Sequence, residues 1–192
     1  MKMTKSIHGV LLISCLLAVS SCKKEEPRFI IYNGVMEMSI NGEPVSYETA
    51  TEFEAPIQET FFVFATNERN EGVFRIREQI GIEKIPFRMG RHELVSGTRQ
   101  PTTEGPYGFF STLEGGDVPS DFYELDSTAD NYMQITAFHE DVGVIVGEFE
   151  MTFLLDTQTH DFYEVPERLE LRDGHFAIPA HRGWIEQLKE NQ

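Results

Sequence analysis

Hydrophobic and polar residues alternate along most of this chain with a period of two, which is typical of β-strands that bury one face. The longest example spans residues 144–155, where Glu148 and Glu150 fall on the polar side. The predicted inward set of this run is Ile145, Gly147, Phe149, Met151, Phe153 and Leu155. Residues 61–65 are instead apolar throughout, which predicts a central strand covered on both faces.

Shorter runs of the same kind, separated by turn signals, predict further strands. They lie at residues 36–40, 45–51, 73–77, 92–95, 107–113, 132–138 and 169–178. Asn41 and Gly42 tolerate positive φ and predict a tight hairpin after the first of these strands. Asp173 and Gly174 predict a turn within the last one.

Only one segment shows a helical period, at the C-terminal end of the chain. Its apolar face is formed by Trp184, Ile185 and Leu188. This segment either docks on the β core or frays. Because no longer helix is available for crossovers, the strands should be antiparallel. We therefore predict an all-β fold, an antiparallel β-sandwich or partly open barrel of about 8–10 strands, with a short C-terminal helix. The β domain would span residues 29–179 and the helical tail residues 180–192.

The N-terminal segment has the organisation of an export signal. Residues 1–5 are basic, residues 10–19 are mainly apolar, and small residues precede Cys22. An apolar run of this length is too short to span a bilayer and is typical of a cleaved signal peptide. We expect a signal peptide at residues 1–21 and a short tether at residues 22–28.

The order Val19-Ser20-Ser21-Cys22 resembles the lipobox of bacterial lipoproteins. That resemblance implies cleavage before Cys22, lipid attachment to its sulfur and acylation of the new amino terminus. Processing would also remove Cys15, so the mature chain would contain one cysteine and no disulfide. Several acyl chains anchor a protein far more firmly than one.

The charged residues that follow Cys22 resemble the start of mature lipoproteins in the Bacteroidota. They are Lys23, Lys24, Glu25 and Glu26. This resemblance implies a lipid anchor in the outer membrane, with the orientation, toward the cell surface or the periplasm, left open.

Five short motifs, taken in order, resemble the small Bacteroidota lipoproteins of the DUF6252 type, a family of unknown function. They are Ile40-Asn41-Gly42, Gly90-x-x-x-Leu94, Met133-Gln134-Ile135-Thr136, Gly147-x-Phe149 and Asp173-Gly174-x-Phe176. The resemblance covers residues 34–179 and implies no catalytic residues.

The chain is strongly acidic, with 32 Asp and Glu against 16 Lys and Arg and a net charge of −16. Loss of residues 1–21 removes two of these basic residues and no acidic one, leaving a net charge of −18. Such a charge excludes a nucleic-acid partner, which requires clustered cations. It also disfavours electrostatic attachment to anionic lipid, so contact with the membrane should depend on the lipid anchor.

The densest acidic segment, residues 114–130, is predicted as a solvated loop. Its acids are Glu114, Asp117, Asp121, Glu124, Asp126 and Asp130. A Ca²⁺ site there is the alternative, although the spacing of a calcium-binding loop is absent. The same acids are the candidates for a carboxylate-dependent glycan hydrolase.

Other catalytic patterns are missing from the sequence. Five histidines remain after processing, at positions 92, 139, 160, 175 and 181, and none has the spacing of a zinc site. No serine lies in a Gly-x-Ser-x-Gly motif. We therefore predict no cofactor, no metal site and no enzymatic activity.

Aromatic residues and one long connection are the candidate binding surfaces. The tetrapeptide Asp-Phe-Tyr-Glu occurs at residues 121–124 and again at 161–164, each predicted to place one ring inward and one outward. Outward rings of Tyr107, Tyr123 or Tyr163 would stack on sugar or protein, whereas inward rings would cap the core. Residues 96–108 form a long connection rich in glycine and proline, where binding residues often lie.

The sequence thus favours a lipid-anchored outer-membrane protein that binds a ligand or partner, such as a glycan or an envelope protein, without catalysis. A glycan-active enzyme and a structural component of an envelope complex are the alternatives.

Overall fold

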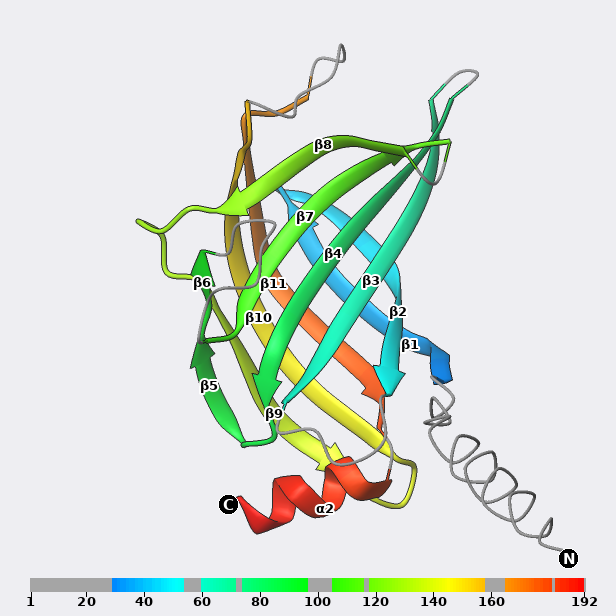
Figure 1. Cartoon of the computed structure of the whole chain (residues 1–192), viewed down its shortest axis with the longest axis vertical. Coiled ribbons are helices and arrows are strands. Elements are labelled where there is room, and N and C mark those ends of the chain that lie inside the picture. Colours follow the sequence, from blue (N-terminus) through cyan, green and yellow to red (C-terminus); the bar gives the residue numbers. More distant parts are fainter. Residues whose placement is uncertain are drawn as a thin grey trace, which may run out of the picture.

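The computed structural model describes residues 29–53, 60–71, 74–96, 105–115, 118–157, 165–180 and 182–191. It shows an all-β fold with one short helix at its C-terminal end (Figure 1). The elements are β1 (Phe29–Ile40), β2 (Glu43–Phe53), β3 (Thr60–Glu71), β4 (Phe74–Pro86), β5 (Gly90–Glu93), β6 (Val95–Ser96), β7 (Tyr107–Glu114), β8 (Val118–Leu125), β9 (Tyr132–His139), β10 (Val144–Leu155), β11 (Arg168–Pro179) and α2 (Arg182–Glu190). The predicted signal peptide and Cys22 lie outside the described residues.

Eight antiparallel strands close into a barrel rather than a sandwich. Their order is β1, β2, β3, β4, β7, β8, β10 and β11, and β11 pairs with both β10 and β1. An eight-stranded barrel leaves an interior that side chains can fill or that holds one small ligand. Which of these applies depends on the packing at each end.

One edge of β10 is shared by two strands that follow each other in the chain. Its last residues pair with β8, and its first residues pair with β9. Between them the chain turns at residues 126–131, where the buried Asn131 amide donates to the Asp126 carbonyl and accepts from the Thr152 N–H. Alongside, β5 pairs with β9, and β6 pairs with β7 in parallel. The successive strands β5 and β6 therefore link β9 to β7 beside the part of β10 that β8 does not pair.

The alternating sequence pattern determines which side chains fill the barrel. In β10, Phe149, Met151 and Phe153 are fully buried, whereas Glu148 is exposed, as predicted. Gly147 is also on the inward side, and a Cβ placed there would lie 2.2 Å from the ring of Phe176. This close approach explains a glycine in the middle of a long strand.

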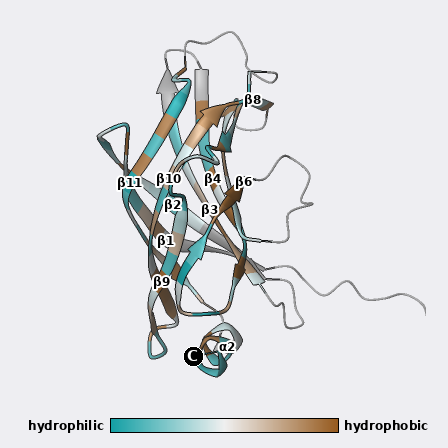
Figure 2. Cartoon of the chain, turned by 90° about the vertical axis from the view of Figure 1, so that its left-hand side faces the viewer, coloured by the Kyte–Doolittle hydropathy of each residue, from teal (hydrophilic) through white to brown (hydrophobic). Residues whose placement is uncertain are grey.

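The C-terminal helix closes one end of the barrel (Figures 1 and 2). Trp184, Ile185 and Leu188 are buried, so the predicted apolar face docks rather than frays. The ring of Trp184 lies 5.2 Å from that of Phe61 and 5.4 Å from that of Phe87. Burial of this stripe is what stabilises so short a helix.

Two local predictions were wrong. Residues 114–130 are not one loop, because β8 occupies their centre. Its alternating burial shows that the acidic residues share a strand with inward apolar ones. Asp173 and Gly174 do not form the predicted turn: β11 continues through them, Asp173 has a φ of 52°, and the pairing with both neighbouring strands shifts close by. This feature is a β-bulge, which has the same residue preferences as a tight turn.

Candidate functional site

The end of the barrel opposite α2 contains a cavity. It lies beside the Asn41–Gly42 turn and has a volume of about 340 Å³. The residues that line this mouth cavity are Ile40, Asn41, Glu43, Val45, Asn67, Glu78, Phe110, Thr112, Tyr123, Val165, Pro166 and Leu169. They come from β1, β2, β3, β4, β7, β8 and β11 and from the segment before β11. A volume of this size is in the range that fits a small molecule.

One side of the mouth cavity is polar. The Tyr47 hydroxyl, buried behind it, donates a hydrogen bond to Oε2 of Glu78 over 2.5 Å. The hydroxyl of Thr112 donates to the buried carboxylate of Asp121 over 2.7 Å. These bonds hold the polar groups in fixed positions, since a buried polar side chain is costly unless it is hydrogen-bonded.

The other side of the mouth cavity is apolar and aromatic. Phe110 meets Tyr123 edge to face, with ring centroids 5.4 Å apart. The Tyr123 hydroxyl donates to the carbonyl of Pro166 over 2.9 Å, which ties the segment before β11 to the wall. Val45 and Leu169 contribute aliphatic surface. A ligand here would meet both hydrogen-bonding groups and apolar contacts.

The charge of the lining is negative. Glu43 and Glu78 contribute carboxylates, and none of the described residues that line the mouth cavity is Lys, Arg or His. An anionic ligand would meet like charge without a compensating cation, whereas a cationic or neutral ligand would not.

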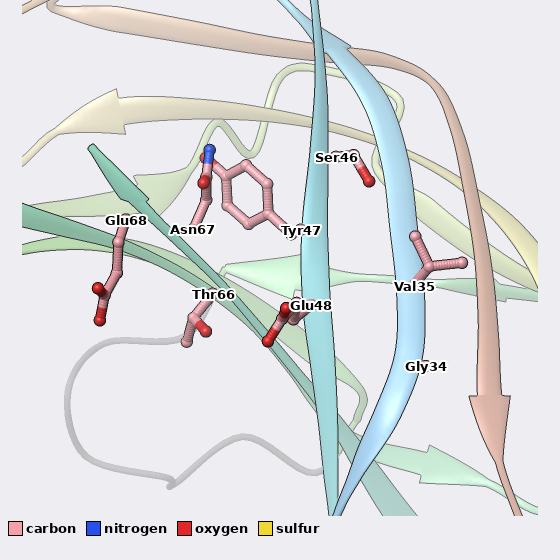
Figure 3. A pocket seen from close by; sticks show the side chains of 8 residues that line it. All are labelled: Gly34, Val35, Ser46, Tyr47, Glu48, Thr66, Asn67 and Glu68. Atoms are coloured by element: carbon pink, nitrogen blue, oxygen red, sulfur yellow. The ribbon is translucent and has the colours of Figure 1, made fainter. Parts of the chain in front are cut away.

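A second hollow, the side groove, opens where β2 and β3 diverge. Their pairing covers Glu48–Thr66, Thr49–Ala65 and Ala50–Phe64 alone, while the β1–β2 pairing continues to the turn at Asn41. The groove has a volume of about 560 Å³ and is lined by Gly34, Val35, Ser46, Tyr47, Glu48, Thr66, Asn67 and Glu68. Figure 3 shows the Tyr47 ring extending from β2 across the gap toward Asn67. Asn67 lines both the groove and the mouth cavity, so Tyr47 and Asn67 stand between them.

The acidic residues of 114–130 whose contacts are described bond to neighbouring residues of the barrel and do not converge on one cleft. None of those that the structure describes lines the mouth cavity. Asp126 accepts hydrogen bonds from the hydroxyl and N–H of Thr128 and pairs with Arg168 over 2.6 Å. The bonds from Thr128, followed by Arg168, lower the pKa of Asp126. Asp130 contacts Arg91, and Asp117 lies outside the described residues. Among the described residues, this arrangement supports neither a calcium site nor a hydrolase site.

The candidate stacking tyrosines are buried where the structure describes them. Tyr123 and Tyr107 both have 7% exposure or less, so of the two alternatives their rings pack inward against the core. Tyr107 donates to Glu83, and burial followed by this bond raises its pKa. The outward ring of the first Asp-Phe-Tyr-Glu segment is Phe122, whose ring stacks on that of Phe109. Tyr163 and residues 97–104 of the long connection lie outside the described residues.

The histidines are dispersed. His92 is buried, its Nε2 lies 2.7 Å from the Arg88 carbonyl, and burial lowers its pKa. His139 and His175 are exposed, and His160 and His181 lie outside the described residues. Within the described ranges, no group of three or more His, Cys, Asp or Glu side chains could hold a metal ion.

Comparisons of the chain with protein-family models, with curated proteins and with solved structures found no match. The resemblance to the DUF6252 type therefore stays a prediction from the sequence. No helix in the described part of the chain is long and apolar enough to cross a membrane.

Among the residues that line the mouth cavity, the sequence alone singles out Tyr123 as a candidate binding residue and does not identify the polar ones. Their signal is a polar residue at an inward position of a strand, as with Asn67 in β3 and Thr112 in β7. These polar residues interrupt the apolar face of their strands, but a polar residue near the rim of a barrel does not by itself indicate a binding site. Only the closure of the barrel shows that these interruptions share one end.

Proposed function

We propose that this protein is a lipid-anchored outer-membrane protein that binds a small cationic or neutral amphipathic molecule in its mouth cavity. The observation that carries the proposal is the contrast in lining: carboxylates and amides on one side, aliphatic and aromatic groups on the other. Small-molecule sites are typically concave and apolar with a few placed polar groups.

The anchor rests on the order of residues before Cys22. Replacing Cys22 with Ala should release the protein from the membrane fraction. Retention of the C22A variant in that fraction would contradict the lipid attachment.

Two probes of matched shape test the choice of charge. Phenethylamine and 3-phenylpropionate share a phenyl ring and a two-carbon linker but carry opposite charges. We expect the amine to bind the processed protein in detergent and the carboxylate not to bind, measured by calorimetry at low and physiological salt. Equal binding of both probes, or of neither, would contradict the proposed ligand class.

Two substitutions test the location. V45F adds bulk to the lining of the mouth cavity, whereas V142F makes the same change at an exposed turn beside α2. We expect V45F to weaken amine binding at least tenfold and V142F to leave it unchanged. Unchanged binding by a folded V45F protein would place the ligand elsewhere.

A further inference from the structure

The edge of β2 that faces the side groove presents backbone groups that β3 does not pair. The β1–β2 turn has two residues, Asn41 and Gly42, with φ angles of 51° and 86°. In such a hairpin the flanking pair, Ile40 and Glu43, exchanges both backbone hydrogen bonds. Alternation then directs the backbone groups of the next residue, and of every second residue after it, away from β1.

These outward backbone groups belong to Pro44 and Ser46. The next in the alternation, Glu48, pairs with Thr66 of β3, as this geometry requires. In the described part of the chain, neither Pro44 nor Ser46 has a pairing partner on β3. Proline has no N–H, so the edge offers two carbonyls and a single donor, the N–H of Ser46. An antiparallel strand can therefore exchange two hydrogen bonds with Ser46 and donate one to the Pro44 carbonyl.

The side chains along this edge define what an added strand should carry. Ser46 and Glu48 are exposed on the outer face, whereas Val45 and Tyr47 point inward. Glu48 forms no ion pair among the described residues. Across the groove, Glu68 is bonded to Arg77 over 2.8 Å. An added strand would meet the unneutralised carboxylate of Glu48 on its outer side and the apolar groups of Val45 and Tyr47 on its inner side.

We infer that the side groove receives an extended segment of a partner protein, with alternating basic and apolar residues, which adds to the edge of β2 as a strand. Strand addition obtains affinity from backbone hydrogen bonds and specificity from alternate side chains. The groove of about 560 Å³ between the diverging strands provides the space (Figure 3). Binding here does not require a ligand in the mouth cavity, so it is independent of the proposed function.

The test uses an acetylated and amidated heptapeptide of alternating Lys and Val, added to the processed full chain in detergent. S46P removes the one backbone donor of the edge, while S46A removes only the hydroxyl. We expect S46P to weaken binding about tenfold, because the peptide carbonyl loses its donor, and S46A to bind within twofold of wild type. Circular dichroism and thermal unfolding establish that both variants are folded.

A second measurement needs no change at Ser46. The same peptide, N-methylated at every second residue on the edge that would face β2, cannot donate to Pro44 or approach Ser46. We expect the affinity of the methylated peptide to fall at least tenfold. We also expect the E48K variant to bind the unmodified peptide more weakly than wild type does. Equal affinity of the methylated and unmodified peptides would overturn the inference, since it would show attraction to the acidic surface alone. Wild-type affinity in folded S46P would also overturn it.

Discussion

The two ends of the barrel differ in what fills them. At the α2 end, the rings of Phe61, Phe87 and Trp184 lie within 5.4 Å of one another and occupy the interior. At the open end, the corresponding space is a cavity of about 340 Å³ whose lining includes Glu78 and Asn67. Packing therefore stabilises one end, and polar groups held in place at the other leave room for a ligand. Substitutions at the two ends should differ in kind as well as in size.

The largest effect is expected at the α2 end. W184A removes a buried ring from between two others and should lower the free energy of unfolding by about 3–5 kcal/mol. Urea unfolding followed by circular dichroism measures it. The control V142A trims an exposed side chain of the neighbouring turn and should change stability by about 0.5 kcal/mol or less. A loss no larger for W184A than for V142A would show that α2 does not close the barrel.

A smaller loss is expected at Gly147 of β10, which packs against the Phe176 ring of β11. In G147A the new methyl would lie 2.2 Å from the Phe176 ring and 2.3 Å from the Gln134 carbonyl, so the wall must shift. We expect a destabilisation of about 1–3 kcal/mol in the same urea experiment. In G105A the nearest atom to the new methyl would be 3.8 Å away, so this control should be close to neutral. Equal stability of the two variants would contradict the close packing.

At the open end, the hydrogen bond between Tyr47 and Glu78 should contribute less. Y47F deletes the hydroxyl and should cost about 1 kcal/mol of stability. Y132F removes the hydroxyl of a half-buried tyrosine that keeps its contact with Arg91, and should cost less. If Y47F also weakens amine binding while Y132F does not, the bond positions Glu78 for the ligand. A loss of stability in Y132F as large as that in Y47F would contradict this role.

The smallest effect is a pH dependence at His92. Burial lowers the folded-state pKa of His92 below its ordinary value of 6.5, so the unfolded chain binds a proton first as the pH falls. The contribution is full above pH 6.5 and is lost progressively below it, toward the folded-state pKa. Unfolding free energies measured between pH 7.5 and 5 should therefore fall less in H92Q than in wild type. H139Q, which changes an exposed histidine, should keep the wild-type slope; a wild-type slope in H92Q would contradict the account.

The sequence predicts the strands better than it predicts the ends. The alternation of residues 144–155 and the Asn41–Gly42 turn depend on local chemistry, and both appear as expected. Closure of the barrel depends on pairing between β11 and β1, residues far apart in the chain, which no local pattern reveals. The same reason conceals the mouth cavity, because Asn67 and Thr112 look like unrelated polar substitutions until the strands are assembled.

The predictions that were wrong concern residue types that suit two different local structures equally well. Asp173 and Gly174 satisfy a bulge as readily as a turn, since residues that tolerate positive φ, as Asp173 adopts here, are favoured in both. Acidic residues predicted a loop at 114–130, but there an inward Asp121 is compensated by Thr112 within the wall. A buried carboxylate with a fixed donor cannot be distinguished by sequence from a solvated one.

The central claim is that ligand binding belongs to the open end alone. Methyl chemical shifts of the processed protein, titrated with phenethylamine in detergent, test it most directly. We expect shifts for Ile40, Val45 and Leu169 at the mouth cavity and none for Ile185 and Leu188 of α2. Shifts at the α2 end without shifts at the mouth cavity would contradict it.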